Sequence, residues 1–428
     1  MSITEAQKEW KDLAKDDEEL AGAIQWMQET FKDSPILGSM INPVICSIKN
    51  KPSPWLLLQS KLNKKTSLSS ESMIAAKGMV KTAELLSQIY SWVTTNPPYL
   101  GERKQNKKLV SFLKDNYFDE KADLATSFIS RCEKFVGLGV QSVVVPQHWL
   151  FQHSYKSFRK KILKTERVNL IAQLGGKAFE SKVGADVILV MFKQSNNLKG
   201  CNLYDVETIE DKITLLKNHQ LVNNDFNSIL KDSDLRIVVS EETTSENHID
   251  VESIIKLNNQ GLSTGDNPRF RRTNWEVESY KSIWDYEQSS VSNSIHYGGR
   301  TGVILWENGS GSLKRFGIDN VKTLHNVDRR GEASWGEIGI SISMMGSLGA
   351  SLYRGSKFDT NSTVLIPKKP EDLTMLWAYC RSEQFYIDVR KINQSLKVTN
   401  STFSKVKFDL TKFNDLAKEG YPKCLPLP

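Results

Sequence analysis

Hydrophobic positions in the first part of the chain recur at helical spacing. In residues 4–32 apolar side chains fall three or four positions apart, which predicts an amphipathic helix. Residues 33–70 are rich in Ser, Pro, Asn and Lys and predict a loop with short helical pieces, and a second helix is expected at 71–90. Residues 1–87 are therefore expected to form a helical leader with an irregular loop.

From 88 to 200, short apolar runs alternate with basic helical stretches. Helices are expected at 122–137 and 154–165, and strands at 88–95, 140–145, 169–174 and 186–192. This alternation is typical of βαβ units and predicts a largely parallel sheet. A hairpin between 169–174 and 185–192 fits the same residues equally well. The fold class predicted is α/β.

The remaining residues predict a connector and a second domain. Residues 201–260 are polar, whereas residues 261–428 are dominated by Gly, Ser, Asn, Arg and Trp and predict a mixed, β-rich domain with a helix at 371–392. Residues 303–311 superficially fit a strand followed by a Gly-Ser-Gly cofactor loop. The residues that follow have poor helical periodicity, so a glycine hairpin turn is favoured.

Composition narrows the class of protein only a little. With 39% hydrophobic and 25% charged residues the chain resembles an ordinary globular protein, and its net charge of +7 is compatible with a polyanionic partner. The N-terminus has no apolar signal region and no run is long enough to span a membrane, which indicates a cytoplasmic protein. The scattered cysteines form no CxxC pair and argue against a zinc cluster or disulfides: Cys46, Cys132, Cys201, Cys380 and Cys424.

The strongest chemical signal is the turn Asn96-Pro97-Pro98-Tyr99 at the end of a predicted strand. An exocyclic amine of adenine is a poor nucleophile because its lone pair is delocalised into the ring. The side-chain oxygen of Asn96 and the carbonyl of Pro97 can accept its hydrogens and hold it nearer to sp³ geometry. Tyr99 offers a face on which a flipped base can stack. The alternative is a Pro-Pro turn capped by a surface tyrosine; the preceding strand and the basic loop that follows favour function.

These residues belong to a set of blocks that resembles a known family, the adenine-specific methyltransferases of the PglX type from BREX phage-defence systems. The chain is also similar to the large methylase halves of restriction-modification enzymes. The resemblance rests on TNPPYLG at 95–101, EKADLATSFISRC at 120–132, VVVPQHWLFQHSYKSFRKKIL at 143–163, NLIAQLGGKAFE at 169–180, ADVILVMFK at 185–193 and GLSTGDNPRFRRTNWEVE at 261–278.

The resemblance implies a fold, an activity and a cofactor. It implies a partial Rossmann-like methyltransferase sheet at 88–200, a target-recognition domain at 261–428 and site-specific N6 methylation of adenine in double-stranded DNA, with S-adenosylmethionine as methyl donor. Pro98 completes the catalytic motif. One departure is that residues 1–95 show no glycine-rich cofactor loop after a strand. The chain could then be a fragment, a recombination cassette or one piece of a split enzyme with a missing methyltransferase half or other defence-system subunits as partners.

Basic residues supply candidate DNA contacts. A basic loop follows the motif, a basic helix lies near residue 160, and an Arg- and Trp-containing segment follows residue 261; the ordinary alternative is a solvated surface. The candidates are Arg103, Lys104, Lys156, Arg159, Lys160, Arg269, Arg271, Arg272 and Trp275, with Arg329, Arg330 and Trp335 extending the last surface.

Other polar residues carry weaker interpretations. His148 and His153 are interpreted as packed loop histidines rather than metal ligands or general bases, and no metal is predicted. Asp123 either orients the catalytic loop or caps the helix that follows. Two rival functions are a catalytically inactive DNA-binding or specificity module and a glutamine methyltransferase acting on a protein. The long Arg- and Trp-rich part after residue 261 disfavours the second rival.

Overall fold

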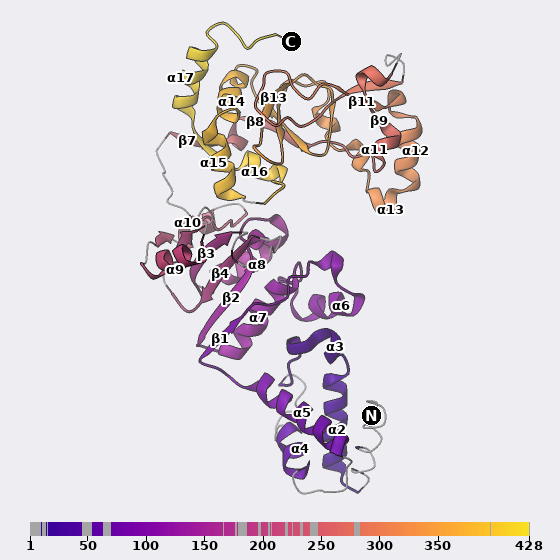
Figure 1. The fold of residues 1–428 in the computed structure, drawn as a ribbon, viewed down its shortest axis with the longest axis vertical. Helices are drawn as coiled ribbons and strands as arrows, with labels where there is room; N and C mark the ends of the chain where they lie inside the picture. Colours follow the sequence, from indigo (N-terminus) through magenta and orange to yellow (C-terminus); the bar gives the residue numbers. More distant parts are fainter. Residues whose placement is uncertain are drawn as a thin grey trace. The chain divides into compact units, whose positions relative to one another are not determined.

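The computed structural model of the chain divides into two compact units, residues 1–239 and 240–428, which are described separately (Figure 1). The division falls inside the stretch 201–260 that the sequence predicts as a connector. The beginning of the helix expected at 4–32, Cys46, and most of 176–185 lie outside the described residues. These are 10, 14, 16–44, 54–62, 70–165, 167–175, 178, 186–195, 198–203, 206, 208–218, 221–224, 226–231, 234–239, 247–277, 283–393 and 395–427.

Helices form the first part of unit 1: α2 (Glu18–Phe31), α3 (Ser34–Leu37), η1 (Gly38–Met40), α4 (Pro54–Leu62) and α5 (Ser70–Ser87). Helix α2 begins where the Asp17 side chain accepts a hydrogen bond from the backbone N–H of Leu20. The apolar face of α2 is buried against α4 and α5, with the Trp26 and Trp55 rings 5.7 Å apart. Burial of this face stabilises the helices more than their intrinsic propensity does.

A six-stranded sheet follows, in the order β1-β2-β4-β3-β5-β6. Its strands are β1 (Trp92–Thr95), β2 (Val140–Pro146), β3 (Val168–Gly175), β4 (Val187–Phe192), β5 (Leu198–Asn202) and β6 (Val222–Asn224). Among these described strands only the pairs β1–β2 and β3–β5 are parallel, so the prediction of a largely parallel sheet is wrong. Strands β3 and β4 are antiparallel neighbours, which confirms the hairpin alternative, because residues 176–186 are too few for a helical crossover.

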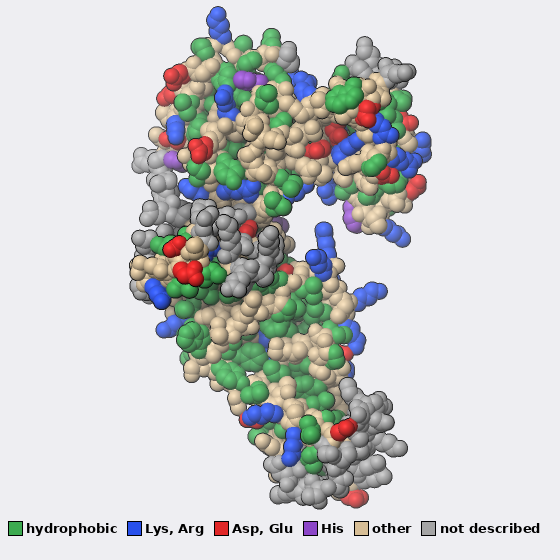
Figure 2. All heavy atoms as spheres, in the orientation of Figure 1, with side chains coloured by type: hydrophobic (Ala, Val, Ile, Leu, Met, Phe, Trp, Pro, Cys, Tyr) green, Lys and Arg blue, Asp and Glu red, His purple; other side chains and the backbone are tan. Residues whose placement is uncertain are grey.

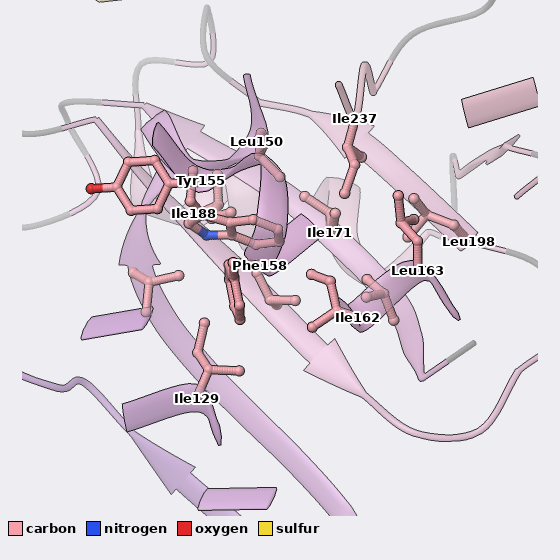
Figure 3. Packing of buried hydrophobic residues seen from close by; sticks show 14 of the residues in the cluster. Ile129, Leu150, Tyr155, Phe158, Ile162, Leu163, Ile171, Ile188, Leu198 and Ile237 are labelled. Atoms are coloured by element: carbon pink, nitrogen blue, oxygen red, sulfur yellow. The ribbon is translucent and has the colours of Figure 1, made fainter. Parts of the chain in front are cut away.

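Helices and side chains from both ends of the sheet build the core of unit 1. The elements are η2 (Glu102–Lys104), α6 (Lys107–Asn116), α7 (Leu124–Val136), η3 (Gln147–Leu150), η4 (His153–Tyr155), α8 (Lys156–Lys164), α9 (Ile209–Lys217) and α10 (Phe226–Lys231). In Figure 3, Ile129 of α7 and Phe158 and Ile162 of α8 gather near the buried strand residues Ile171 and Ile188. The apolar runs of the strands and the helical spacing of the apolar residues in α7 made these elements predictable from sequence.

A buried arginine joins the helical part of unit 1 to α7. Arg131 is 1% exposed, and its guanidinium donates hydrogen bonds to the carbonyls of Ser39 (3.0 Å), Ile41 (2.7 Å) and Leu86 (3.0 Å). These carbonyls lie in η1, directly after it, and in the last turn of α5, where intrahelical donors are missing. One side chain therefore satisfies the ends of two helical segments.

The described part of unit 2 contains three antiparallel or mixed sheets. The first has the order β13-β12-β15-β8, the second β14-β10-β11-β9, and β16 pairs with β7. The strands are β7 (His248–Asp250), β8 (Ile255–Gln260), β9 (Arg271–Thr273), β10 (Trp284–Gln288), β11 (Gly302–Leu305), β12 (Gly339–Ser343), β13 (Ala350–Tyr353), β14 (Lys357–Phe358), β15 (Ser362–Pro367) and β16 (Lys407–Asp409).

The helices of unit 2 lie against these sheets. They are η5 (Val251–Ser253), α11 (Asn267–Phe270), η6 (Asn274–Glu276), η7 (Glu307–Gly309), α12 (Ser312–Asp319), α13 (Val321–Leu324), η8 (Val327–Arg329), η9 (Glu332–Ser334), α14 (Asp372–Cys380), α15 (Glu383–Ile392), α16 (Asn400–Ser404) and α17 (Leu410–Gly420). The continuous helix expected at 371–392 is wrong: it breaks after Cys380, and the Ser382 side chain starts α15 by accepting from the N–H of Phe385.

The stretch 303–311 also differs from its prediction. Strand β11 does not turn into a hairpin; it leads through η7 into α12. The carboxylate of Glu307 accepts hydrogen bonds from the backbone N–H and the hydroxyl of Ser312, which lowers the pKa of Glu307 and starts the helix. Because this carboxylate already lies at the first turn of α12, the segment does not offer an open phosphate-binding turn.

Candidate functional site

The Asn-Pro-Pro-Tyr segment, predicted from sequence as a turn, is irregular in the structure and follows β1 directly, at the end of the sheet where the parallel strands β1 and β2 both finish. Strand β1 ends at Thr95, which pairs with Val143 of β2. Pro97 and Pro98 lack backbone N–H groups, so the strand cannot continue through them. Asn96 is exposed and Pro97 is buried, so the turn presents the amide side chain to solvent.

The Tyr99 side chain links the segment after β1 to strand β2. Its hydroxyl lies 2.6 Å from Asn96 Oδ1 and 3.2 Å from the carbonyl oxygen of Val144 in β2. Burial raises the pKa of Tyr99, so the phenol keeps its single proton at neutral pH and donates it to one of these two acceptors. In the part of the chain that the structure describes, no donor is bonded to the carbonyl of Pro97. Asn96 Oδ1 is therefore already hydrogen-bonded to the Tyr99 hydroxyl, whereas the carbonyl of the buried Pro97 keeps its capacity to accept a hydrogen bond.

Asp123 fixes the chain that leaves the turn. Its carboxylate, in a side chain 5% exposed, accepts from the N–H of Leu100 (3.3 Å) and from the N–H of Ala125 in the first turn of α7 (2.8 Å). The N–H of Leu124 returns a bond to the carbonyl of Leu100 (3.0 Å). Asp123 thus does both things that the sequence left open: it caps α7 and orients the loop after Tyr99.

The end of β2 carries two polar residues beside this turn. Gln147 is 2% exposed, and neither its Oε1 nor its Nε2 has a hydrogen-bond partner. The His148 ring lies 5.4 Å from the Tyr155 ring, and burial lowers the pKa of His148 although Asp123 opposes the shift. His148 is therefore neutral at pH 7 and packs as a loop histidine. The sequence analysis did not identify Gln147 as a candidate site residue. The one feature that could have indicated it is its position directly after a buried strand that ends in proline.

The basic residues of α8 do not share one environment. Arg159 is 0% exposed and donates to the carbonyls of Trp149, Gln152, Asp234 and Leu235, so it binds the protein's own backbone. Lys156 is half-buried and Lys160 is exposed. Arg103 and Lys104, immediately after the Asn-Pro-Pro-Tyr turn, are exposed as well. Unit 1 therefore offers exposed cations near the turn and on α8, but Arg159 is not one of them.

In unit 2 the predicted DNA-contacting residues divide in the same way. Arg271 is half-buried and pairs at 2.6 Å with the buried carboxylate of Glu287. Arg269 is exposed and stacks on Phe270, Arg272 is exposed, and Trp275 is 72% exposed. Figure 2 shows Lys and Arg side chains, with acidic ones among them, over the part of unit 2 that carries β9, α11 and α12.

The other arginines and the tryptophan proposed for this surface are partly engaged. Arg329 is exposed and faces Glu332 at 3.4 Å. Arg330 is exposed, whereas Trp335 is half-buried, contacts the Trp306 ring at 5.1 Å and lies 4.8 Å from Lys357 Nζ. Trp335 thus contributes to packing in unit 2, which leaves Arg269, Arg272, Trp275, Arg329 and Arg330 as its exposed candidates.

Comparisons with known proteins relate part of this chain to restriction-modification methylases. Residues 6–179 match the family model described as Eco57I restriction-modification methylase.

Two curated relatives are adenine-specific methyltransferases. Over 229 residues, 48% of this chain, the sequence is 25% identical to the adenine-specific methyltransferase PglX of Lacticaseibacillus casei (strain Zhang). Over 122 residues, 28% of the chain, it is 31% identical to the adenine-specific methyltransferase BrxX of Escherichia coli O9:H4 (strain HS). These stretches span 18% and 10% of the relatives' own lengths.

Among solved structures, the chain is similar in fold to a nuclease-deletion mutant of the Type ISP restriction-modification enzyme LlaGI in complex with a DNA substrate mimic. The TM-score is 0.51 at 12% sequence identity, covering 85% of this chain and 37% of that one. The likeness concerns the mixed α/β fold.

Cofactor and metal chemistry find little support in the described residues. The segment after β11 has its helix start filled by the Glu307 carboxylate, so it does not provide a cradle for S-adenosylmethionine. No group of three or more His, Cys, Asp or Glu side chains is placed to hold a metal in the same residues. None of the helices the structure describes is both long and apolar enough to cross a bilayer.

Proposed function

We propose that this chain carries the target-base site of a site-specific DNA adenine N6-methyltransferase. The observation that carries the proposal is the turn at the end of β1, where Asn96 Oδ1 and the Pro97 carbonyl are held beside an aromatic ring. The match to a methylase family and to adenine-specific relatives supports it.

The residues of the turn would act by orienting the amine. Asn96 Oδ1 and the Pro97 carbonyl accept the two N6 hydrogens, which shifts lone-pair density from the ring toward the nitrogen. The ring of Tyr99 stacks on the flipped adenine. Because the Tyr99 hydroxyl lies 2.6 Å from Asn96 Oδ1 before the base enters, it must turn to its second acceptor, the Val144 carbonyl. Asp123 keeps the following loop fixed during this exchange.

DNA contact is assigned to the exposed basic residues. In unit 1 these are Arg103, Lys104 and Lys160, together with the half-buried Lys156. In unit 2 they are Arg269, Arg272, Arg329 and Arg330, with Trp275 as an exposed aromatic. Exposed cationic side chains are free to bind phosphates and base edges, unlike guanidinium groups buried in the protein interior. Arg159 and Arg271 are left out because their guanidinium groups are already bonded inside the protein.

The methyl donor in this proposal is S-adenosylmethionine, which supplies an electrophilic methyl group. The described residues identify no site for it, so the full reaction is proposed to involve further residues of the enzyme or a partner that supplies the cofactor-binding half. Binding of a flipped base to Asn96–Tyr99 can be measured without the cofactor. The target-base site can therefore be tested independently of where S-adenosylmethionine binds.

The test has two parts on the purified full chain. S-adenosylmethionine binding is measured by calorimetry, and transfer to DNA is measured as N6-methyladenine, with Asn96→Ala as control. Separately, affinity is compared between a duplex with an extrahelical adenine and one with an abasic bulge. We expect a preference for adenine that Asn96→Ala abolishes without lowering the melting temperature. Equal affinity for the two duplexes, or methylation of another base, would overturn the proposal.

A further inference from the structure

Gln147 has an unusual environment for a buried amide. Its side chain is 2% exposed, and both of its polar atoms lie without a hydrogen-bond partner. Among the buried side-chain amides that the structure describes, Gln147 alone has both its oxygen and its nitrogen without a hydrogen-bond partner. Buried polar groups are otherwise almost always paired, and an unpaired one is often explained by function.

The contrast with Gln141, at the other end of the same strand, shows that β2 can satisfy a buried amide. Gln141 is 1% exposed, and its Nε2 donates to the carbonyl of Ile129 at 3.1 Å. An ordinary packing position would tolerate leucine in place of Gln147 and avoid an unsatisfied group. The unpaired amide at 147 therefore calls for a partner outside the chain.

Gln147 lies at the same end of the sheet as the Asn-Pro-Pro-Tyr turn. Thr95 pairs with Val143, so Asn96 follows β1 where Val144 continues β2, and the Tyr99 hydroxyl reaches the Val144 carbonyl at 3.2 Å. Gln147 follows three residues later, within roughly 10 Å along an extended chain. Its backbone N–H is held by the Asp186 carbonyl at 3.0 Å, which fixes the residue at the junction of β2 and β4. Ligands bind beyond the ends of strands at such edges.

We propose that Gln147 is a specificity-determining residue of this site, whose Nε2 donates a hydrogen bond to a ring nitrogen next to the amine of the flipped adenine. The inference rests on the proposed function. Asn96 and Pro97 recognise only an NH₂ group, which cytosine and amides also carry. Adenine has an acceptor nitrogen on either side of its amine, N1 and N7. Guanine carries a hydrogen at N1, so a donor placed there rejects guanine. Cytosine has an acceptor, N3, beside its amine but no counterpart of N7, so a donor placed at N7 rejects cytosine.

The rearrangement that frees Asn96 would also uncover Gln147. In the free protein both Asn96 Oδ1 and the Gln147 amide are kept from a substrate, the first by the Tyr99 hydroxyl and the second by burial. When the base enters, Tyr99 turns to Val144 and the base replaces the covering side chains at Gln147. The unsatisfied amide then gains the partner that the free protein does not supply.

The experiment measures affinity of the full chain for duplexes with an extrahelical adenine, 1-deazaadenine, 7-deazaadenine or an abasic bulge. For the wild type we expect adenine to bind about tenfold more tightly than the analogue that lacks the contacted nitrogen, the size of one hydrogen bond. Gln147→Leu should lose this preference, while Gln141→Leu should keep it. The deaza analogue whose affinity falls identifies N1 or N7 as the acceptor.

Thermal unfolding separates recognition from structure. Gln147→Leu removes an unsatisfied buried group and should leave the melting temperature unchanged or raise it, whereas Gln141→Leu should lower it. If the wild type prefers adenine over the abasic bulge but Gln147→Leu keeps every preference among the bases, the assignment of Gln147 is refuted and the target-base site stands. The assignment is equally refuted if Gln147→Leu lowers the melting temperature and weakens binding of all four duplexes alike. No preference for adenine in the wild type refutes the target-base site itself.

Discussion

Because Arg159 lies in the protein interior, we predict that its replacement lowers the stability of unit 1 without removing a DNA contact. Replacing Arg159 with Met keeps most of the side-chain volume and removes the guanidinium. Four carbonyls then lose their donor: those of Trp149 (2.6 Å), Gln152 (2.7 Å), Asp234 (2.8 Å) and Leu235 (2.9 Å). Leu235 has a positive φ of 56°, so Arg159 also holds a strained residue in place.

The expected cost follows from the burial of these groups. Each buried carbonyl left unpaired costs about 1–3 kcal/mol, and removal of the buried cation recovers part of its desolvation penalty. Two of the four hydrogen bonds are buried and two are partly buried, so the summed cost less the recovered desolvation penalty is about 3–5 kcal/mol. For a unit of this size, that corresponds to a drop in melting temperature of about 6–20 °C.

The assay compares Arg159→Met with Lys160→Met, the neighbouring exposed position on α8. Circular dichroism gives the melting temperature, and DNA affinity is measured at several salt concentrations. Arg159→Met should melt earlier and, below its transition, keep the wild-type salt dependence. Lys160→Met should melt as the wild type and reduce the slope of log affinity against log salt by about 1, as expected for one lost phosphate contact. An unchanged melting temperature together with a reduced slope for Arg159→Met would refute the structural assignment.

Three further predictions concern the site. Asp123→Ala should destabilise unit 1 by about 0.5–2 kcal/mol, as loss of a helix cap does, with Asp123→Asn losing less; equal stability in denaturant titrations would contradict the capping role. Tyr99→Ala should weaken binding of an extrahelical adenine by about 1–3 kcal/mol while Tyr99→Phe changes it little, and a large loss in Tyr99→Phe would show that the hydroxyl matters more than the ring. Because burial lowers the pKa of His148, the unfolded state binds its proton more readily, so unit 1 should lose stability as pH falls below the ordinary histidine value of about 6.5. Melting curves between pH 7.5 and 5 should show a smaller loss in His148→Gln, and an identical loss would exclude His148 as the source.

The elements that could be predicted from sequence are those with strong local patterns. The apolar runs at 140–145 and 186–192 and the helical spacing in 122–137 correspond to β2, β4 and α7, whose apolar side chains contribute to the core of unit 1. Strand direction could not be predicted in the same way, because parallel and antiparallel pairs bury similar apolar runs. The short stretch between β3 and β4 was the one local sign of the hairpin.

The position of the Asn96–Tyr99 segment could be predicted from sequence because proline ends a strand. Two prolines after a strand predicted a stiff turn at Asn96–Tyr99. The structure ends β1 at Thr95, as expected, but the segment that follows is irregular and forms no hydrogen-bonded backbone turn. The basic residues were not predictable individually, because Arg159 and Lys160 are adjacent in sequence and only tertiary packing separates an interior side chain from an exposed one. Helix α12 was missed for a related reason: its start depends on the Glu307 carboxylate rather than on its own periodicity.

The position of Arg131 has a consequence for the order in which unit 1 can form during synthesis. Its acceptors precede it by 92, 90 and 45 residues, so Ser39, Ile41 and Leu86 leave the ribosome well before their donor does. Until α7 emerges, those carbonyls must remain hydrated, and the helices that end there cannot bury them. The helices before β1 can pack their apolar faces together earlier, but these carbonyls gain their donor only when Arg131 has been synthesised. Release of a polypeptide shorter than this point would yield helices whose ends face water permanently.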